Sequence, residues 1–219
     1  MYGMLSIQMT AYRFLLVSLG IDAILDGLTI RGRRKKLGEI ARGNGLSDAY
    51  AEALKRLNKQ GKGESELGMD VLMWVLHSER PLRAEELCHA LGVEKESDDL
   101  DIEGVPDLQT VLSSCLGLVT VEASSSIVRP VHFTLQEYLL NNPNLFKNPH
   151  SKIAEVCLTY LNFSCLWDQS PTPDDVPLEE YASCYWEKHA RIGMTEKVKA
   201  LVLKLLNRQA APFGRQFVG

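Results

Sequence analysis

The sequence contains the stretch Val131-His132-Phe133-Thr134-Leu135-Gln136-Glu137-Tyr138-Leu139. Its first residues are typical of a β-strand and its later ones of an α-helix, so we expect a strand that runs straight into a helix. Thr134 and Glu137 have the spacing of a capping box, in which each side chain satisfies a free backbone N–H at the helix start. Phe133 and Tyr138 can add a hydrophobic staple that fixes the angle of entry. His132 would then lie beside a helix N-terminus, where free N–H groups and the helix dipole favour an anion.

The side chain of His132 has two interpretations. Alternation along a strand puts Val131 and Phe133 on one face and His132 on the other. If Phe133 belongs to the core, His132 points outward near the helix start, where it can meet a phosphate. The alternative is a structural histidine that is hydrogen-bonded at the edge of a sheet.

Three helices are expected before this stretch, each from apolar residues at helical spacing. Trp74 lies on the first, which we expect to be central to the core; Gly92 ends the second, and Pro106 and Gly117 bound the third. Two strands follow at 118–122 and 127–133, joined by a serine-rich turn at 123–126, and Pro130 makes the second strand an edge strand or gives it a bulge. Three helices followed by a hairpin is the order of a winged helix. The apolar stripes are Met69, Leu72, Met73 and Leu76; Ala84, Leu87, Cys88 and Leu91; and Leu108, Val111, Leu112 and Cys115.

Helices are also expected on both sides of this unit. Residues 11–60 are predicted to be helical, including a nearly apolar helix at 14–25 and a stripe of Tyr50, Ala53, Leu54 and Leu57. The polar residues 61–65 suggest a flexible break. After Pro149, helices are expected around 153–161 and 181–190, and a last one is capped by Thr195. We therefore predict a mainly α fold: a helical segment at 1–63, a central winged helix at 64–145 and a C-terminal helical connector at 146–219.

Composition narrows the functional classes. The formal net charge is −4, so nothing in the overall charge attracts nucleic acid or an acidic membrane. The five cysteines are scattered, and Cys88, Cys115 and Cys157 lie on apolar helical stripes, where reduced core cysteines are common. The first residues lack a basic segment before the apolar run and are not typical of a targeting signal. These features predict a soluble, cytoplasmic protein that does not bind a membrane.

Sequence motifs of common enzymes are absent. The chain has no GxxxxGK[ST] loop for phosphate, no GxSxG serine elbow and no HExxH zinc motif. The acidic pairs Glu85-Glu86 and Asp174-Asp175 are expected to be solvated. We therefore predict no catalytic residue, no metal site and no cofactor of its own, and a chain that is not an enzyme.

Nucleic-acid binding is the alternative that a winged helix raises. A helix that reads DNA needs Arg, Lys, Asn or Gln on its exposed face. The third helix offers Gln109, Thr110 and Ser113 but no cation, and the only basic residue of the hairpin is Arg129. The basic run at 31–36 is better explained as the solvated face of a helix that also carries Leu37 and Ile40. The sequence therefore disfavours nucleic acid as a partner.

The order of several segments resembles that of fungal NACHT-type signalling ATPases of the NOD-like-receptor (STAND) kind, which are often followed by ankyrin repeats. The middle of the chain resembles the domain family named "GPI inositol-deacylase winged helix". The segments that carry the resemblance are 14–19, 21–25, 47–50, 71–75, 80–91, 114–119, 131–139 and 154–161.

The resemblance implies a role. Residues 12–60 would correspond to the helical end of a NACHT module, 64–142 to its winged helix and the rest to a connector toward the repeats. In such receptors a histidine at the strand-to-helix junction contacts the β-phosphate of bound ADP and holds the closed state, and His132 matches it. Phe133 stands where plant-type relatives carry an acid. The chain would then be a truncated receptor, a non-enzymatic regulatory module whose partner is a NACHT ATPase half or an ankyrin-repeat region in cis or in trans, and which can also self-associate.

Overall fold

The computed structural model describes residues 29–34, 46–94, 97–168, 172 and 175–210. The expected helix at 14–25, the stripe of Leu37 and Ile40, and the residues beyond 210 lie outside this description. A helical turn at 30–34 carries Arg31, Arg33 and Arg34 with exposed side chains, as a solvated basic run predicts.

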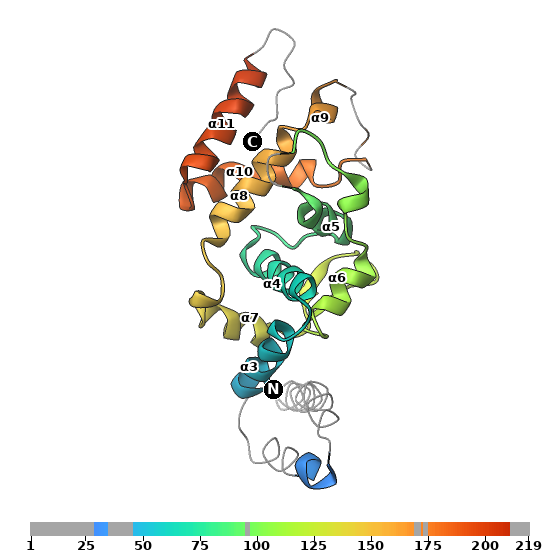
Figure 1. The fold of residues 1–219 in the computed structure, drawn as a ribbon. Coiled ribbons are helices and arrows are strands. Elements are labelled where there is room, and N and C mark those ends of the chain that lie inside the picture. The colour runs from blue at the N-terminus through green and yellow to red at the C-terminus, as the bar shows by residue number, and fades with distance from the viewer. Residues whose placement is uncertain (1–28, 35–45, 95–96, 169–171, 173–174, 211–219) are drawn as a thin grey trace, which may run out of the picture.

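The described residues form a mainly helical protein with one small antiparallel sheet, which confirms the predicted fold class (Figure 1). Before the sheet, the helices are α3 (Leu46–Asn58), α4 (Lys62–His77), α5 (Ala84–Gly92) and α6 (Leu108–Ser114). The strands are β1 (Val119–Val121) and β2 (Val128–Pro130). After the sheet come α7 (Phe133–Leu140), α8 (Pro149–Leu161), α9 (Ser164–Asp168), α10 (Glu179–Ile192) and α11 (Glu196–Gln209). Short 3-10 turns lie at Ile102–Gly104 and Pro143–Leu145.

Helix α4 lies at the centre of the core, as the sequence predicted. It packs against α3, α5, α6, α7 and α8, and Trp74 is 2% exposed. Gly68 lets α4 approach the end of α6 closely, because a Cβ at this position would lie 2.6 Å from the backbone oxygen of Ser114. The predicted stripes of α3, α5 and α6 face this same core.

The hairpin and the helices before it form a winged helix. Val119 pairs with Pro130 and Val121 with Val128. The segment between α4 and α5 runs beside β2 and forms a short β-bridge with it. In this bridge, the Val128 N–H donates to the carbonyl of Leu82 at 2.9 Å. This bridge, which continues at Arg83 and Ile127, was not predicted from the sequence. The bridge covers only the beginning of β2, and in the two-stranded sheet β2 is an edge strand, as Pro130 indicated.

Several expected boundaries were wrong. Residues 62–65, expected as part of a flexible break, form the first turn of α4. Pro106 does not open α6; the helix is capped by Asp107, whose carboxylate accepts the Thr110 N–H at 2.9 Å. The second strand is shorter than predicted and ends at Pro130, although the Val131 N–H still donates to the carbonyl of Leu118 at 2.9 Å.

The C-terminal helices pack on one another and on the winged helix. Helix α8 contacts α10, α11 and α4, so the buried core is continuous from α4 into α8. Thr195 caps α11 by accepting the Val198 N–H at 3.1 Å, as predicted. Cys88, Cys115 and Cys157 are buried and carry free thiols, as their positions on apolar stripes indicated.

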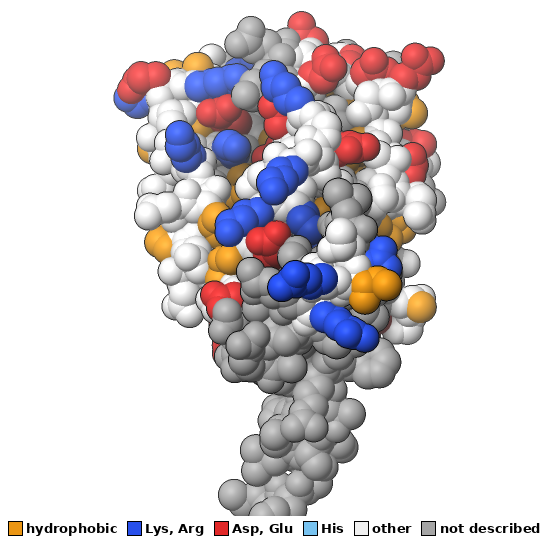
Figure 2. All heavy atoms as spheres, turned by 60° about the horizontal axis from the view of Figure 1, so that its bottom comes forward, with side chains coloured by type: hydrophobic (Ala, Val, Ile, Leu, Met, Phe, Trp, Pro, Cys, Tyr) orange, Lys and Arg blue, Asp and Glu red, His pale blue; other side chains and the backbone are white. Residues whose placement is uncertain are grey.

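Two surface properties complete the description. Within the residues that the structure covers, no helix combines the length and the apolar character needed to cross a membrane. The end of the molecule that carries α3 displays Lys and Arg side chains across its middle, with acidic side chains gathered at the far rim (Figure 2). Helix α3 itself ends on the basic residues Lys55 and Arg56.

Candidate functional site

The strand-to-helix junction places His132 at the start of α7, but not as the sequence predicted. The helix begins at Phe133, so His132 is the N-cap, and the capping box expected from Thr134 and Glu137 is wrong. Nδ1 of His132 accepts the Thr134 N–H at 3.4 Å and lies 2.8 Å from the Thr134 hydroxyl oxygen. That hydroxyl lies 2.8 Å from the phenol oxygen of Tyr50 on α3.

These contacts fix the tautomer of a neutral His132. Because Nδ1 accepts from a backbone N–H, the ring proton must be on Nε2. The Thr134 hydroxyl can then donate to Nδ1 while it accepts from the hydroxyl of Tyr50. Nε2 has no hydrogen-bond partner among the described residues and is left as a donor at the beginning of the helix.

The expected position of Phe133 was also wrong. Its side chain is 53% exposed and its ring lies against His132, with 4.4 Å between ring centroids. The first helical turn rotates Phe133 out of the core, which Leu135 and Leu139 fill instead. Tyr138 packs on Tyr50, with 5.5 Å between centroids, so the staple to Phe133 does not form.

Helix α7 exposes two large apolar side chains to solvent. Phe133 and Leu140 are seven residues apart, on the same side of the helix, and Leu140 is 57% exposed. Beside the helix start lies a cleft of about 330 Å³, lined in part by Phe133, Gln136 and Arg129. The junction therefore combines a half-buried imidazole donor, exposed apolar side chains and a cleft, a set of features suited to contact with another protein.

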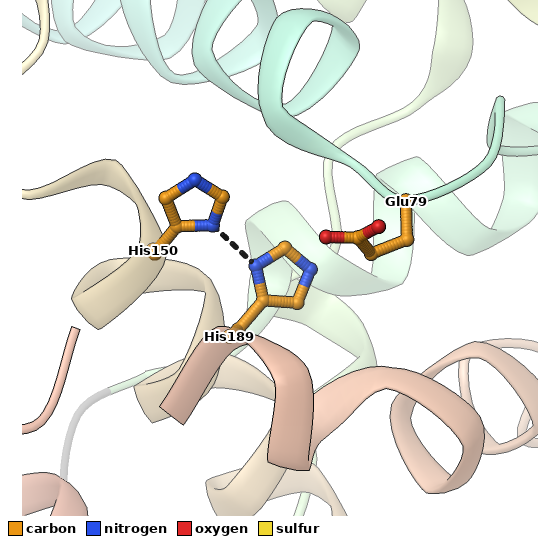
Figure 3. Close-up of side chains that lie close together, drawn as sticks. All are labelled: Glu79, His150 and His189. Carbon is orange, nitrogen blue, oxygen red and sulfur yellow. Dashed lines mark hydrogen bonds between the residues drawn. The ribbon is translucent and has the colours of Figure 1, made fainter. Parts of the chain in front are cut away.

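A second cluster brings together residues that are distant in the sequence (Figure 3). Glu79 follows α4, His150 lies in the first turn of α8 and His189 in the last turns of α10. Nδ1 of His150 lies 2.9 Å from Nδ1 of His189. One donor atom from each of the three residues lies within 4.8 Å of the others, so together they could hold a metal ion.

The histidines of this cluster are neutral at ordinary pH. Burial, with a smaller contribution from His150, lowers the pKa of His189 to about 4. Burial also lowers the pKa of His150. Nε2 of His189 lies 2.9 Å from the hydroxyl of Tyr181, which accepts the Glu79 N–H at 3.0 Å. Both imidazoles therefore keep a lone pair for hydrogen bonding or for a ligand.

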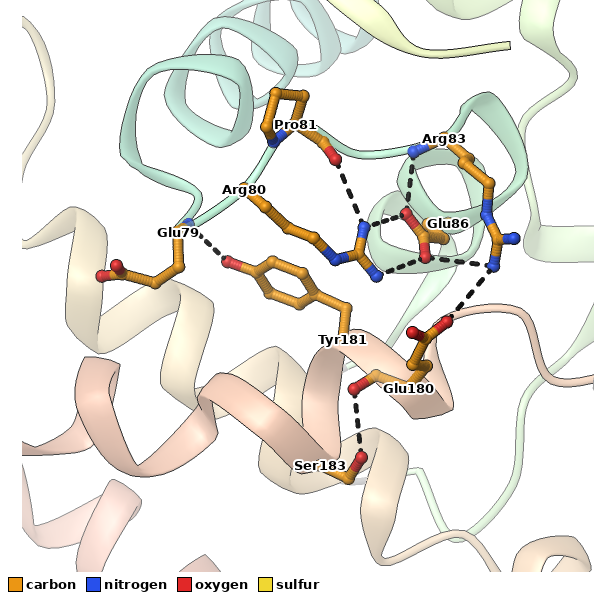
Figure 4. A network of polar contacts seen from close by, with 8 residues as sticks. All are labelled: Glu79, Arg80, Pro81, Arg83, Glu86, Glu180, Tyr181 and Ser183. Atoms are coloured by element: carbon orange, nitrogen blue, oxygen red, sulfur yellow. Dashed lines mark hydrogen bonds and ion pairs between the residues drawn. The ribbon is translucent and has the colours of Figure 1, made fainter. Parts of the chain in front are cut away.

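A third group of polar residues lies around the start of α5 (Figure 4). Arg80 donates two hydrogen bonds of 2.8 Å to the carboxylate of Glu86, which also accepts the Arg83 N–H at 2.8 Å. Glu86 is fully buried, so the expectation that the Glu85-Glu86 pair is solvated was wrong for Glu86, while Glu85 is exposed. Burial raises the pKa of Glu86, but the hydrogen bonds from Arg80 and Arg83 outweigh it and hold the pKa below its usual value.

The surface that a winged helix would use for DNA has the composition expected from the sequence. Gln109, Thr110 and Ser113 are exposed on α6. Arg129 on the hairpin pairs with Glu122 at 3.5 Å. The sequence located His132 at the strand-to-helix junction from the residues around it. It missed the cluster of Glu79, His150 and His189, because these residues have no short spacing and come together only where α8 packs on α10.

The fold and its connectivity define a winged-helix domain within a larger helical protein. Residues 55–154 match the family described as GPI inositol-deacylase, winged helix domain. The match runs from the second half of α3 through the first turns of α8 and includes all of α4 to α7. Comparisons with curated proteins and with solved structures give no match.

Proposed function

We propose that this chain is a non-enzymatic regulatory and protein-interaction module of a NACHT-type signalling ATPase. The family match to a winged-helix domain and the ordered resemblance of the flanking segments to NACHT-type receptors support the proposal. The chain contains no phosphate-binding loop, so the nucleotide would be held by the partner. We expect this chain to work in the cytoplasm.

The observation that carries the proposal is the geometry of His132. Its Nδ1 is occupied by the helix cap, which orients the ring and leaves the Nε2–H as a donor beside the first turn of α7. A phosphate oxygen of ADP on a docked ATPase domain would accept that hydrogen bond. Phe133 and Leu140 would be covered by the same partner.

The experiment measures affinity between this chain and a separately purified NACHT domain, taken from a protein in which that domain precedes a winged helix of the same family. Titration calorimetry with the NACHT domain loaded with ADP should show binding, and removal of ADP should weaken it. A hydrogen bond to a charged group contributes about 1.5–3 kcal/mol, so loss of the Nε2–H should weaken ADP-dependent binding by about tenfold or more.

The decisive variant is His132→Asn. The amide oxygen of asparagine is a preferred N-cap acceptor and can replace Nδ1, but asparagine has no group at the position of Nε2. Binding that weakens in His132→Asn while stability is retained supports the phosphate contact. Equal binding by wild type and His132→Asn, with and without ADP, would show that His132 is only a cap.

A further inference from the structure

The cluster of Glu79, His150 and His189 has the donor set of a metal site, and the proposed function does not use it. The three side chains come from three elements that meet only in the folded chain (Figure 3). His189 is fully buried, and the side chain of Glu79 is 15% exposed. Two imidazole nitrogens and one carboxylate are typical ligands of Zn²⁺, with a fourth position left for water.

We propose that Glu79, His150 and His189 bind a divalent transition metal, with Zn²⁺ as the best fit. The two Nδ1 atoms point at each other across 2.9 Å. Without a metal, this contact needs one proton between the two nitrogens. With a metal, both lone pairs face the ion, and the proton moves to the Nε2 atom of the same ring.

Tyr181 supports the metal-bound arrangement. A histidine that ligates a metal usually donates its second ring N–H to an oxygen, which fixes the orientation of the ring. The Tyr181 oxygen lies 2.9 Å from Nε2 of His189 and can accept this proton. The same oxygen accepts the Glu79 N–H, so Tyr181 positions the backbone of one ligand and the ring of another.

Among the described residues, Lys188 would compete with the ion for the Glu79 carboxylate, which its ammonium group contacts. The lysine side chain is 61% exposed and can turn into solvent when the carboxylate binds a cation. Lys188 and the metal are therefore alternative partners of Glu79. His77 lies against His150 with 5.4 Å between ring centroids, and also against Phe146, so it packs beside the site.

The metal would join the winged helix to the C-terminal helices. Glu79 lies in the segment between α4 and α5, whereas His150 and His189 belong to α8 and α10. A bound ion would thus hold the orientation of the two parts of the chain. The site would be a structural clamp, distinct from the His132 contact, and its test does not depend on an ATPase partner.

The test uses the full chain, freed of metal with a chelator and titrated with ZnCl₂ and, separately, with CoCl₂. We expect one equivalent of Zn²⁺ to bind and to raise the melting temperature, because a ligand that binds only the folded state stabilises it. Co²⁺ should give the visible spectrum of nitrogen and oxygen ligation. Absence of Zn²⁺ binding, or a thiolate charge-transfer band that indicates cysteine ligation, would overturn the proposal.

Variants assign the ligands. Glu79→Gln and His150→Ala should each weaken Zn²⁺ binding by at least tenfold, and Tyr181→Phe, which removes the supporting oxygen, by roughly tenfold to a hundredfold. His89→Ala is the matched control, because His89 contacts Tyr160 instead and its loss should leave the affinity unchanged. Glutamine has nearly the same shape as glutamate, so the Zn²⁺ titration of Glu79→Gln still tests the proposal if His150→Ala does not fold. Unchanged affinity in Glu79→Gln and His150→Ala would contradict the assignment.

Discussion

Replacing Arg80 with methionine should destabilise the protein by about 3 kcal/mol. The carboxylate of Glu86 is fully buried, and Arg80 supplies two of its hydrogen bonds. Removing one partner of a buried pair typically costs 3–5 kcal/mol, because the remaining charge is left uncompensated. We expect the lower end of that range, since Arg80 is 29% exposed and the Arg83 N–H still binds the carboxylate.

The cost should depend on pH. In the wild type the pKa of Glu86 is held below its usual value, so the pair stabilises the fold at neutral pH, and this contribution is lost as the pH falls through the folded-state pKa. Without Arg80, burial dominates and raises the pKa of Glu86. The variant then protonates Glu86 at a higher pH, and the difference in stability between the two proteins should shrink as the pH is lowered.

The assay is urea denaturation of wild type, Arg80→Met, Glu86→Leu and the double variant at neutral and acidic pH. The double variant should be more stable than Arg80→Met, because it removes the buried charge together with its partner. A loss below about 1 kcal/mol for Arg80→Met, or a loss that does not change with pH, would show that Glu86 is not the buried anion described here.

Three further predictions follow from the core and from α7. Trp74→Ala should cost about 3–5 kcal/mol in chemical denaturation, because the ring is almost fully buried; a loss below about 1 kcal/mol would contradict the central position of α4. His132→Ala should cost about 0.5–2 kcal/mol through loss of the cap, whereas His132→Asn should cost little; equal losses would argue against capping by Nδ1. The isolated chain should self-associate or bind a hydrophobic dye through Phe133 and Leu140, and Phe133→Ser should reduce either signal; a monomer that binds no dye would refute this.

Much of the fold could be predicted from the sequence, because helical periodicity and buried stripes carry strong local signals. Val111 on α6, Cys115 directly after it and Leu57 on α3 are fully buried at the positions that their spacing predicted. The helix that starts near residue 133 was also predicted. Its start was wrong by two residues, because His132 and not Thr134 is the cap, and both candidate caps fit the same local sequence.

The remaining features depend on contacts between distant segments. In the sequence, nothing distinguishes Glu86 from its solvated neighbour Glu85. Its carboxylate can be buried because the guanidinium group of Arg80 donates hydrogen bonds to it at the start of α5. His150 and His189 meet because α8 packs along α10, and no spacing rule anticipates this contact. Sequence reasoning therefore located the helices well, and it found a candidate site only where the site is local.

The most direct test of the central claim is a nitrogen NMR measurement on the imidazole of His132. In the isolated chain, we expect the His132 ring to carry its proton on Nε2, because Nδ1 accepts the Thr134 N–H. Addition of an ADP-loaded NACHT domain should shift the Nε2–H resonance and slow its exchange with water, and the same domain without ADP should not. A proton on Nδ1, or a spectrum that ADP-loaded NACHT domain leaves unchanged, would contradict the proposed contact.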